Sequence, residues 1–177
     1  MEKIILTKLK PSDKEAFTNY LTELVVDSGA LKGVEIEDGL SFEQLLEYYS
    51  QCEKIPFVSY EQKKFPFKQY ILLREDDNCI VGAVNIRPHL TRELSENFEG
   101  NIGYSVRPSE RGKGYGKKAL ELALKEFYTL NDSDDVIMCC YKENEPSKRI
   151  IKKYGGTLIE ECQGVLSPQK YLIKKKG

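Results

Sequence analysis

Residues 98–120, FEGNIGYSVRPSERGKGYGKKAL, constrain the fold more than any other stretch of the chain. Large side chains that alternate with small ones predict a strand over residues 101–106. Pro108 ends that strand, and a glycine-rich run at residues 111–116 leads directly into an amphipathic pattern that reaches Leu130. The stretch therefore predicts a strand, a glycine loop and a helix in direct succession.

The glycines at the start of this helix suit the binding of an anion. The first turn of a helix leaves backbone N–H groups without partners and carries the positive end of the helix dipole. Gly112, Gly114 and Gly116 have no Cβ, so a phosphate can approach the main chain. Basic side chains outnumber the single acid Glu110 here, namely Arg107, Arg111, Lys113, Lys117 and Lys118. A phosphate or pyrophosphate is the expected ligand, and a structural cap on an ordinary helix is the alternative.

Two common phosphate-binding motifs do not fit this loop. A Walker A loop requires a hydroxyl residue after its lysine, whereas Gly116 is followed by Lys117 and Lys118. The glycine spacing is G-x-G-x-G, which is not the G-x-G-x-x-G of the Rossmann fold. The sequence therefore argues against both of these nucleotide-binding classes.

The loop does resemble one known family. Arg111-x-x-Gly114-x-Gly116, between a strand and a helix, resembles the acyl-CoA pyrophosphate loop of the GNAT superfamily of N-acetyltransferases, whose pattern is Gln/Arg-x-x-Gly-x-Gly/Ala. The longer phrase GYSVRPSERGKGYG and the later CC-x3-N-x2-S-x7-GG region resemble a bacterial branch described mostly as predicted acetyltransferases. The likeness covers about residues 69–173.

The length of 177 residues fits a single domain over residues 1–177, and the resemblance implies that this is an acetyltransferase domain. Its 27 basic and 28 acidic side chains are balanced, which argues against a general nucleic-acid or membrane-surface protein. No apolar run approaches the roughly 20 residues that span a bilayer, and the N-terminal MEKIILTKLKPSD has too short an apolar core for a secretory signal. We therefore expect a cytoplasmic protein without nucleic-acid or membrane partners.

The cysteines and the histidine predict no metal site. The five cysteines, Cys52, Cys79, Cys139, Cys140 and Cys162, include no C-x-x-C pair, so neither a disulfide framework nor a zinc site is indicated. The single histidine argues against a histidine-rich metal centre.

The remaining patterns predict an alternation of strands and helices. Strands are expected at residues 3–9, 69–74, 79–87, 101–106, 136–141, 157–162 and 169–173. Helices are expected at residues 13–26 and 41–52, from the end of the glycine-rich run to residue 130, and at residues 144–154. Ser41-x-x-Gln44 resembles a capping box. The resemblance implies an α/β (α+β) fold of the GNAT type. Such a fold has a mixed, mostly antiparallel sheet of about seven strands, splayed between the fourth and fifth, with helices on both faces.

The resemblance also implies the cofactor, acetyl-CoA, with CoA as product. Its pantetheine arm is expected to pair with main chain near Val106 between the splayed strands, and its diphosphate to lie on the glycine loop. Asn144 matches a family asparagine that bonds the pantetheine arm, and it also suits an N-cap for the next helix; both roles are compatible. The expected cofactor-binding residues are Val106, Arg107, Arg111, Gly112, Lys113, Gly114, Tyr115, Gly116, Asn144 and Ser147.

Acetyl transfer to an amine needs a base, a donor that polarises the thioester carbonyl, and a way to stabilise the leaving thiolate. Many GNAT enzymes use a tyrosine seven residues after the asparagine as the acid, but Ile151 stands there in this chain. Tyr154 would face about 60° away on the helix. Tyr104 and Tyr141 remain candidates for the acid, and the thiolate can also leave without one.

Candidates for the base are Glu99, Glu96 and His89, and each is otherwise an exposed loop residue. Cys139 and Cys140 are not expected to act as nucleophiles, because a buried thiol stays protonated. Six acids and no base between residues 35 and 53 form either a solvated helix face or a rim that attracts a cationic amine.

We therefore expect an acetyl-CoA-dependent N-acetyltransferase that acetylates a primary amine of a small molecule or protein by direct attack. A CoA-binding regulatory module without catalysis is the alternative, and a nucleotide-phosphate binder unrelated to CoA is a third hypothesis. We expect the first two helices and the loops at 54–68 and 88–98 to form the acceptor pocket, and these segments carry no motif that identifies the acceptor. The sequence carries no signal for the oligomeric state, and a homodimer is one of the states it allows.

Overall fold

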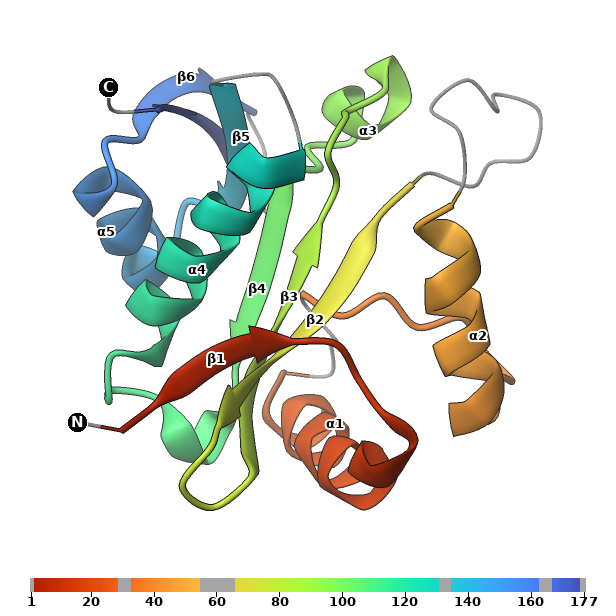
Figure 1. Ribbon diagram of the computed structural model, residues 1–177. Coiled ribbons are helices and arrows are strands. Elements are labelled where there is room, and N and C mark those ends of the chain that lie inside the picture. Colours follow the sequence, from red (N-terminus) through yellow and green to blue (C-terminus); the bar gives the residue numbers. More distant parts are fainter. Residues whose placement is uncertain (1, 29–32, 55–65, 131–134, 163–166, 176–177) are drawn as a thin grey trace.

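The computed structural model describes residues 2–28, 33–54, 66–130, 135–162 and 167–175 (Figure 1). The strands are β1 (Ile4–Thr7), β2 (Lys68–Arg74), β3 (Cys79–Ile86), β4 (Ile102–Val106), β5 (Asp135–Tyr141), β6 (Thr157–Glu161) and β7 (Pro168–Lys174). The helices are α1 (Lys14–Ser28), α2 (Phe42–Cys52), α3 (Arg92–Glu96), α4 (Tyr115–Leu130) and α5 (Glu145–Lys153), with 3-10 turns η1 (Pro11–Asp13) and η3 (Pro108–Glu110). The predicted elements are confirmed, with ends shifted by one or two residues.

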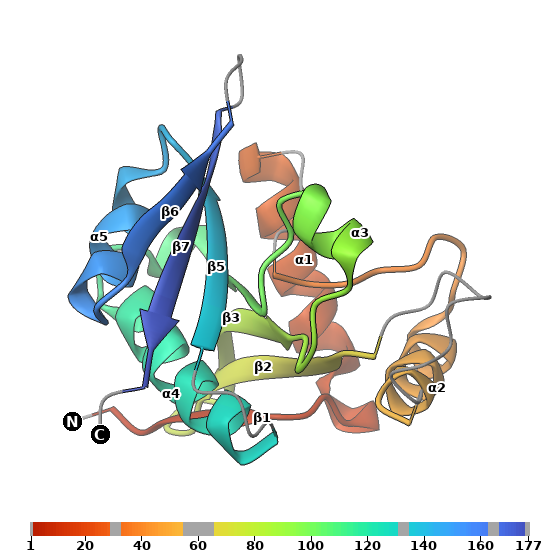
Figure 2. The ribbon, with the colours of Figure 1, turned by 90° about the horizontal axis from the view of Figure 1, so that it is seen from above.

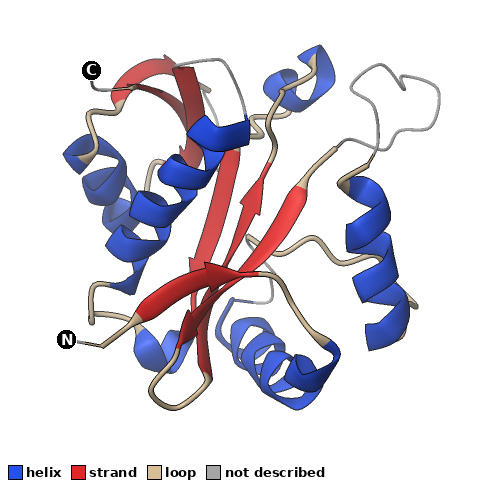
Figure 3. Cartoon of the chain, viewed as in Figure 1, coloured by secondary structure: helices blue, strands red, loops and turns tan. Residues whose placement is uncertain are grey.

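The strands form two sheets that diverge from one another (Figures 2 and 3). One sheet has the order β1-β2-β3-β4 and the other the order β5-β7-β6, and all of their pairs are antiparallel. β4 and β5 are neighbours in space but belong to different sheets. The predicted fold class and the predicted splay between the fourth and fifth strands are therefore confirmed.

A short contact joins the two sheets at the start of β4. Asn101 N–H donates to Ile137 O at 2.8 Å, and Asn101 Oδ1 accepts from Ile137 N–H at 2.8 Å. Asn101 Nδ2 also donates to Arg87 O at 3.0 Å, so one side chain links β5 to the end of β3. Gly100 permits this approach, because a Cβ there would lie 2.8 Å from Ile137 O. Beyond this contact, β4 and β5 separate.

Helices cover both faces of the larger sheet. α1 and α2 lie on one face, where Phe17, Tyr20 and Tyr49 join a buried cluster with β2 and β3. α4 lies on the other face, and its apolar side chains pack between the larger sheet and β5 and β7. These α4 side chains are Tyr115, Ala119, Leu120, Ala123, Leu124 and Phe127. Because burial of one large apolar side chain contributes about 1.5–3 kcal/mol, the two clusters hold the sheet from both sides.

Local signals in the sequence are visible in the structure. The predicted capping box is confirmed, since Ser41 Oγ accepts from Gln44 N–H at 3.2 Å and Gln44 Oε1 accepts from Ser41 N–H at 2.8 Å. The stretch before β4 contains the short helix α3. Most of the loop expected at 54–68 lies outside the described residues, and its last residue already belongs to β2. In the described part of the chain, no helix has both the length and the apolar character needed to cross a bilayer.

Candidate active site

The glycine loop between η3 and α4 has the backbone of a ligand-binding turn. Gly112 and Gly114 adopt φ angles of +81° and +89°, a region that L-residues with a Cβ rarely occupy. A Cβ at either position would meet no atom within 4 Å, so the conformation and not crowding requires glycine. Gly116 differs, because a Cβ added there would lie only 3.0 Å from Ile150 Cδ1 of α5. The first two glycines shape the loop, and the third allows helix packing.

A cavity of about 690 Å³ opens beside this loop, between β4, the start of α4 and α5. Gly112, Gly114, Tyr115 and Gly116 line it, together with Val106. The described residues of its lining include four basic side chains and no acidic one: Arg111, Lys117, Arg149 and Lys153. The helix start adds its unpaired N–H groups, since the first α-helical bond is Lys118 N–H to Gly114 O at 3.2 Å. We call this space the cofactor cavity, because its charge suits a pyrophosphate.

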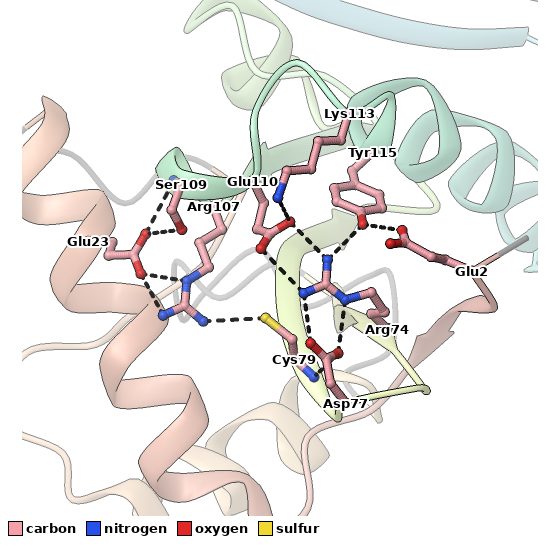
Figure 4. A network of polar contacts seen from close by, with 10 residues as sticks. All are labelled: Glu2, Glu23, Arg74, Asp77, Cys79, Arg107, Ser109, Glu110, Lys113 and Tyr115. Carbon is pink, nitrogen blue, oxygen red and sulfur yellow. Dashed lines mark hydrogen bonds and ion pairs between the residues drawn. The ribbon is translucent and has the colours of Figure 1, made fainter.

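Carboxylates on α1 hold two of the arginines near the loop (Figure 4 shows the first). Arg107 Nε donates to Glu23 Oε1 at 2.6 Å, and this hydrogen bond lowers the pKa of Glu23. Arg111 makes two bonds to Asp27, at 2.9 and 2.8 Å. Arg107 does not belong to the described lining of the cofactor cavity, whereas Arg111 does. The structure thus places Arg107 beneath the loop, where it joins the loop to α1.

A second polar network supports the loop from the side of β2 (Figure 4). The Arg74 guanidinium donates to Glu110 at 2.9 Å, to the Tyr115 hydroxyl at 2.8 Å and to Asp77 at 2.8 Å. Lys113 Nζ donates to the same Glu110 carboxylate at 2.8 Å, and these bonds, that of Arg74 first, lower the pKa of Glu110. Lys113 therefore points to Glu110 and is not in the described lining of the cofactor cavity.

A second cavity, of about 720 Å³, lies where β4 and β5 separate, and we call it the acceptor cavity. Gly33, Val34 and Glu35 enter it from the segment before α2, and Glu96 and Glu99 from the α3 region. Arg87 also lines it and pairs with Glu35 and, at 3.3 Å, with Glu99. Because Glu35 and Glu99 share this one arginine, the described lining has a negative excess, opposite in sign to the cofactor cavity.

Three residues line both cavities: Tyr104, Asn144 and Ser147. The Tyr104 hydroxyl donates to Ser147 Oγ at 3.3 Å, and burial raises the pKa of Tyr104, so this hydroxyl keeps its proton. Asn144 Oδ1 accepts from Ser147 N–H at 3.2 Å, which confirms the predicted N-cap of α5. The two cavities therefore meet at a junction that holds a protonated phenol.

Backbone groups of β4 face the same junction. Arg107 N–H donates to Val81 O at 2.9 Å on β3. Because alternate residues of an antiparallel strand bond to the partner strand, the N–H and C=O groups of Tyr104 and Val106 point away from β3 and toward the gap before β5. Among the described residues, this edge of β4 has no strand partner at the gap, so it is available to a ligand.

The predicted catalytic candidates fall into two groups. Glu99, Tyr104 and Tyr141 line the acceptor cavity, as does Glu96. His89 is exposed and does not belong to the described lining of either cavity. Ile151 is fully buried and lines the acceptor cavity at the position where the family acid was expected.

The adjacent cysteines of β5 also line the acceptor cavity. Burial raises the pKa of Cys139 to about 12 and that of Cys140 to about 11. At neutral pH both are thiols, which agrees with the expectation that neither acts as a nucleophile. In the described part of the chain, no group of histidines, cysteines and acids is arranged to hold a metal ion.

Several residues of the site were not predicted. Arg149 and Lys153 lie four apart on α5, a spacing that places both on one face of a helix and could have been read as a continuation of the basic loop. Asn85 is the one amide in the apolar run CIVGAVNI, and that exception could have marked it. The approach of residues 33–35 has no comparable signal, because it depends on contacts distant in sequence.

Comparison with known proteins agrees with this geometry. The family model for the acetyltransferase (GNAT) domain matches residues 3–157, which include the glycine loop and both strands at the gap. The chain belongs to the GNAT acetyltransferase family. Enzymes of this family use acetyl-CoA. The match begins at β1, so the family likeness extends further toward the N-terminus than the sequence motifs indicated.

Individual relatives are more distant. The uncharacterized N-acetyltransferase YnaD of Bacillus subtilis strain 168 is 29% identical over 93 residues, which are 52% of this chain and 49% of YnaD, so the chain spans about half the length of this curated relative. The Salmonella typhimurium protein yncA, whose structure holds its cofactor acetyl-CoA, is 13% identical over 98% of this chain and 94% of its own, with a TM-score of 0.66. RimL, a ribosomal L7/L12 alpha-N-protein acetyltransferase in complex with coenzyme A, is 15% identical over 97% of this chain and 94% of its own, with a TM-score of 0.67. At these identities the two structures show a shared fold.

Proposed function

We propose that the chain, as one domain over residues 1–177, transfers the acetyl group of acetyl-CoA to a primary amine. The carrying observation is the pair of cavities of opposite charge that meet at Tyr104, Asn144 and Ser147. The basic cavity suits the phosphates of the donor, and the acidic one suits a cationic amine. A small-molecule amine and an exposed amine of a protein both meet this description.

Acetyl-CoA supplies the acetyl group as a thioester, and the amine nitrogen forms a bond to the carbonyl carbon as the carbon–sulfur bond breaks. The unpaired N–H groups of β4 at Tyr104 and Val106 are placed to donate to the carbonyl oxygen as negative charge develops on it. Such backbone donors need no reorganisation during the reaction, because β3 holds β4 in place.

We assign the proton transfers to Glu99 and Tyr104. An amine with a pKa of roughly 10.4 is mostly protonated at neutral pH and must lose a proton before it attacks. Glu99 lines the acceptor cavity, lies 3.3 Å from Arg87 and receives that proton. Tyr104 lies at the junction with its proton retained by burial, and it donates that proton to the leaving thiolate. The resulting phenolate takes the second proton, which the nitrogen loses after it has attacked, and the phenol is restored. Tyr104 thereby takes the role of the acid that Ile151 cannot fill.

One observation favours the alternative of a CoA-binding module without catalysis. Ile151 is fully buried at the position of the usual family acid, and no ionisable group replaces it there. This hypothesis predicts binding of acetyl-CoA without turnover of any amine, and it predicts that Tyr104→Phe changes nothing except stability.

Thermal unfolding tests the cofactor half of the proposal. Acetyl-CoA at a hundred times its dissociation constant should raise the stability of the folded protein by about 2.7 kcal/mol. Gly114→Glu places an acid beside the pyrophosphate and should abolish this shift. Gly39→Glu is the matched control, since Gly39 has a similar φ of +82° and open space around its Cβ position but lies outside the cavity linings. An equal shift from ATP, or no shift at all, contradicts the cofactor assignment.

Turnover of a panel of amines tests the catalytic half. Glu99→Gln should lower kcat, because the amine must then lose its proton without a base, and Tyr104→Phe should lower kcat without changing the dissociation constant of acetyl-CoA. Equal turnover in the parent and in both variants would remove these residues from the mechanism.

A further inference from the structure

The turn that ends α3 carries Glu99 into the acceptor cavity, although it belongs to neither sheet. We call residues 95–99 the α3 turn. Two backbone bonds close it, from Phe98 N–H to Ser95 O at 3.2 Å and from Glu99 N–H to Leu94 O at 2.9 Å. Phe98 adopts a φ of +56°, a left-handed conformation that a bulky residue keeps only where neighbouring groups hold it. Because α3 has only five residues and is not stable by itself, other parts of the fold must fix Glu99.

Lys170 of β7 contacts this turn from the smaller sheet. Its Nζ atom donates to Ser95 O at 3.2 Å and to Ser95 Oγ at 3.4 Å. The same atom lies 4.9 Å from the centre of the Phe98 ring, whose face attracts a cation. One ammonium group therefore contacts both the first residue of the α3 turn and the residue next to Glu99.

The burial of Lys170 indicates that these contacts are its main ones. The Lys170 side chain is 9% exposed, and lysines are rarely buried unless their ammonium groups are paired. Lys170 Nζ also donates to Glu160 Oε2 at 2.6 Å, but the Glu160 side chain is 52% exposed, and an ion pair with an exposed partner contributes little to stability. The ion pair alone does not explain a buried lysine, whereas the bond to Ser95 O does, because an apolar side chain could not donate it.

The strand register directs Lys170 toward the α3 turn. Lys170 stands opposite Cys139 of β5 and Glu160 of β6, and Cys139 lines the acceptor cavity. Successive side chains of a strand point to opposite faces, so Gln169 and Tyr171 leave this face to Lys170. Lys170 itself does not belong to the described lining of either cavity. It therefore acts through the turn and not by contact with a substrate.

Arg87 holds Glu99 from the other side. Arg87 follows β3 of the larger sheet, and its Nη1 atom lies 3.3 Å from Glu99 Oε2 and donates to Gly100 O at 3.3 Å. Arg87 thus contacts the carboxylate and the backbone after it, and Lys170 contacts the turn before it. Because the two basic residues come from different sheets, together they fix the carboxylate across the gap between the sheets.

We propose that Lys170 is a positioning residue for Glu99, which holds the α3 turn so that the carboxylate faces the amine in the acceptor cavity. This inference rests on the proposed acetyl transfer for its effect on turnover, but not for its effect on the turn. Loss of the Lys170 contacts frees the turn, and Glu99 then spends less time where it can receive the proton. A small displacement is enough, because misplacement of a reacting group by about 1 Å can lower a rate by roughly a hundredfold.

Amide hydrogen exchange followed by NMR tests the effect on the turn without any substrate. Lys170→Met keeps most of the side-chain volume and removes the N–H donors. It should quicken exchange of the Phe98 and Glu99 amides by roughly tenfold or more, the range expected when a hydrogen bond to a charged group is lost. The Asn101 amide, which is bonded to β5, should exchange as in the parent.

Three further variants separate the turn from general effects on the sheet. Lys142→Met is the matched control, because Lys142 pairs with an acid of the same sheet but its side chain is 55% exposed, and it should leave the exchange unchanged. Glu160→Gln removes the ion pair but not the bond to Ser95, so it should also leave the exchange unchanged. Phe98→Leu removes the ring and leaves β7 intact. It should quicken exchange of the Glu99 amide, and it tests the proposal even if the first variant unfolds.

Steady-state kinetics tests whether the effect reaches Glu99. The amines are a linear alkyl monoamine, a linear alkyl diamine, an amino sugar and a lysine-containing peptide. Lys170→Met should lower kcat roughly ten- to a hundredfold and leave the dissociation constant of acetyl-CoA unchanged. In a Glu99→Gln background the same substitution should lower kcat far less, since no carboxylate remains to be positioned. Lys170→Arg keeps the charge and the N–H donors and should restore most of kcat.

Each outcome bears on the proposal. Unchanged exchange of the Phe98 and Glu99 amides in Lys170→Met overturns the positioning role. An equal fall of kcat in the parent and in the Glu99→Gln background overturns action through Glu99. Faster exchange in a protein that acetylates none of the four amines contradicts the proposed activity and leaves the hold of Lys170 on the α3 turn standing.

Discussion

Gly33→Ala is the substitution whose effect follows most directly from the structure. Gly33 has a φ of +75°, and a Cβ there would lie 2.6 Å from the Tyr104 carbonyl carbon and 2.7 Å from Ser105 N. These are backbone atoms of β4, held by β3, so they cannot move aside as a flexible side chain could. The segment that carries Glu35 into the acceptor cavity must therefore lift away from β4.

The expected cost has two parts. A left-handed conformation costs an alanine about 1 kcal/mol. Lifting the segment also breaks the bonds from Gln69 Nε2 to Gly33 O and from Glu35 N–H to Gln69 Oε1, both 3.1 Å long, at about 1 kcal/mol each. The total of about 3 kcal/mol corresponds to a fall of roughly 6–12 °C in Tm for a chain of this size.

Gly39→Ala supplies the matched control. Gly39 has a φ of +82°, but a Cβ there would meet no atom within 4 Å. This variant should carry the conformational cost alone, about 1 kcal/mol or roughly 2–4 °C. The effect of alanine on the unfolded chain is the same in both variants and cancels in the comparison.

Differential scanning calorimetry with and without acetyl-CoA measures both effects. Gly33→Ala should keep the shift produced by acetyl-CoA, because the cofactor cavity is not lined by this segment, and it should weaken amine binding. Equal loss of Tm in the two variants would refute the close approach of the segment to β4, and loss of the acetyl-CoA shift in Gly33→Ala would refute the assignment of this segment to the acceptor cavity alone.

Three other predictions concern charge and protonation. Arg149→Gln should weaken acetyl-CoA binding by roughly tenfold and make the dissociation constant less dependent on salt, as measured by calorimetric titration. Lys125→Gln, at an exposed position of α4, is the control and should change neither the dissociation constant nor its salt dependence. At pH 8, mass spectrometry should show that Cys139 and Cys140 are alkylated more than about a hundredfold more slowly in the folded protein than in denaturant, because burial raises both pKa values. The thiols of the unfolded chain ionise above roughly pH 8.5 while those of the folded chain stay protonated, so the free energy of unfolding should fall as the pH rises above that value. The pKa of Glu110 is lowered in the folded state, so the Glu110 carboxylate stabilises the fold above pH 4.5 and this stabilisation is lost as the pH falls through the lowered pKa. In a plot of Tm against pH, Glu110→Gln should therefore show a smaller fall of Tm on the acid side than the parent protein does.

Local order in this protein could be predicted because its causes are local. Alternation along β4, the apolar stripe of α4 and the reciprocal bonds of Ser41 and Gln44 all act over a few residues. The glycine loop belongs to the same class, since the φ angles of Gly112 and Gly114 are properties of the loop itself.

Predictions that depended on distant pairing were less complete. Arg107, just before the loop, and Lys113, within it, were expected on the cofactor. The structure pairs them with Glu23 and Glu110, and Glu23 lies 84 residues from Arg107. A sequence pattern records that a side chain is basic, and the fold decides which acid it meets. The hydrogen bond that Asn85 Nδ2 donates to Gln69 Oε1, at 3.4 Å, is another example, because it joins side chains on two neighbouring strands.

The one-ended contact between the two sheets has a consequence for association between chains. Exposed strand edges on a protein surface are templates on which other chains can add and aggregate. Here the β4 edge that faces β5 is enclosed, with α4 and α5 on one side and residues 33–35 on the other. Asn101 closes it at one end through its bonds to Ile137. The chain thus keeps a strand edge available to a slender ligand while shielding it from the strands of its neighbours.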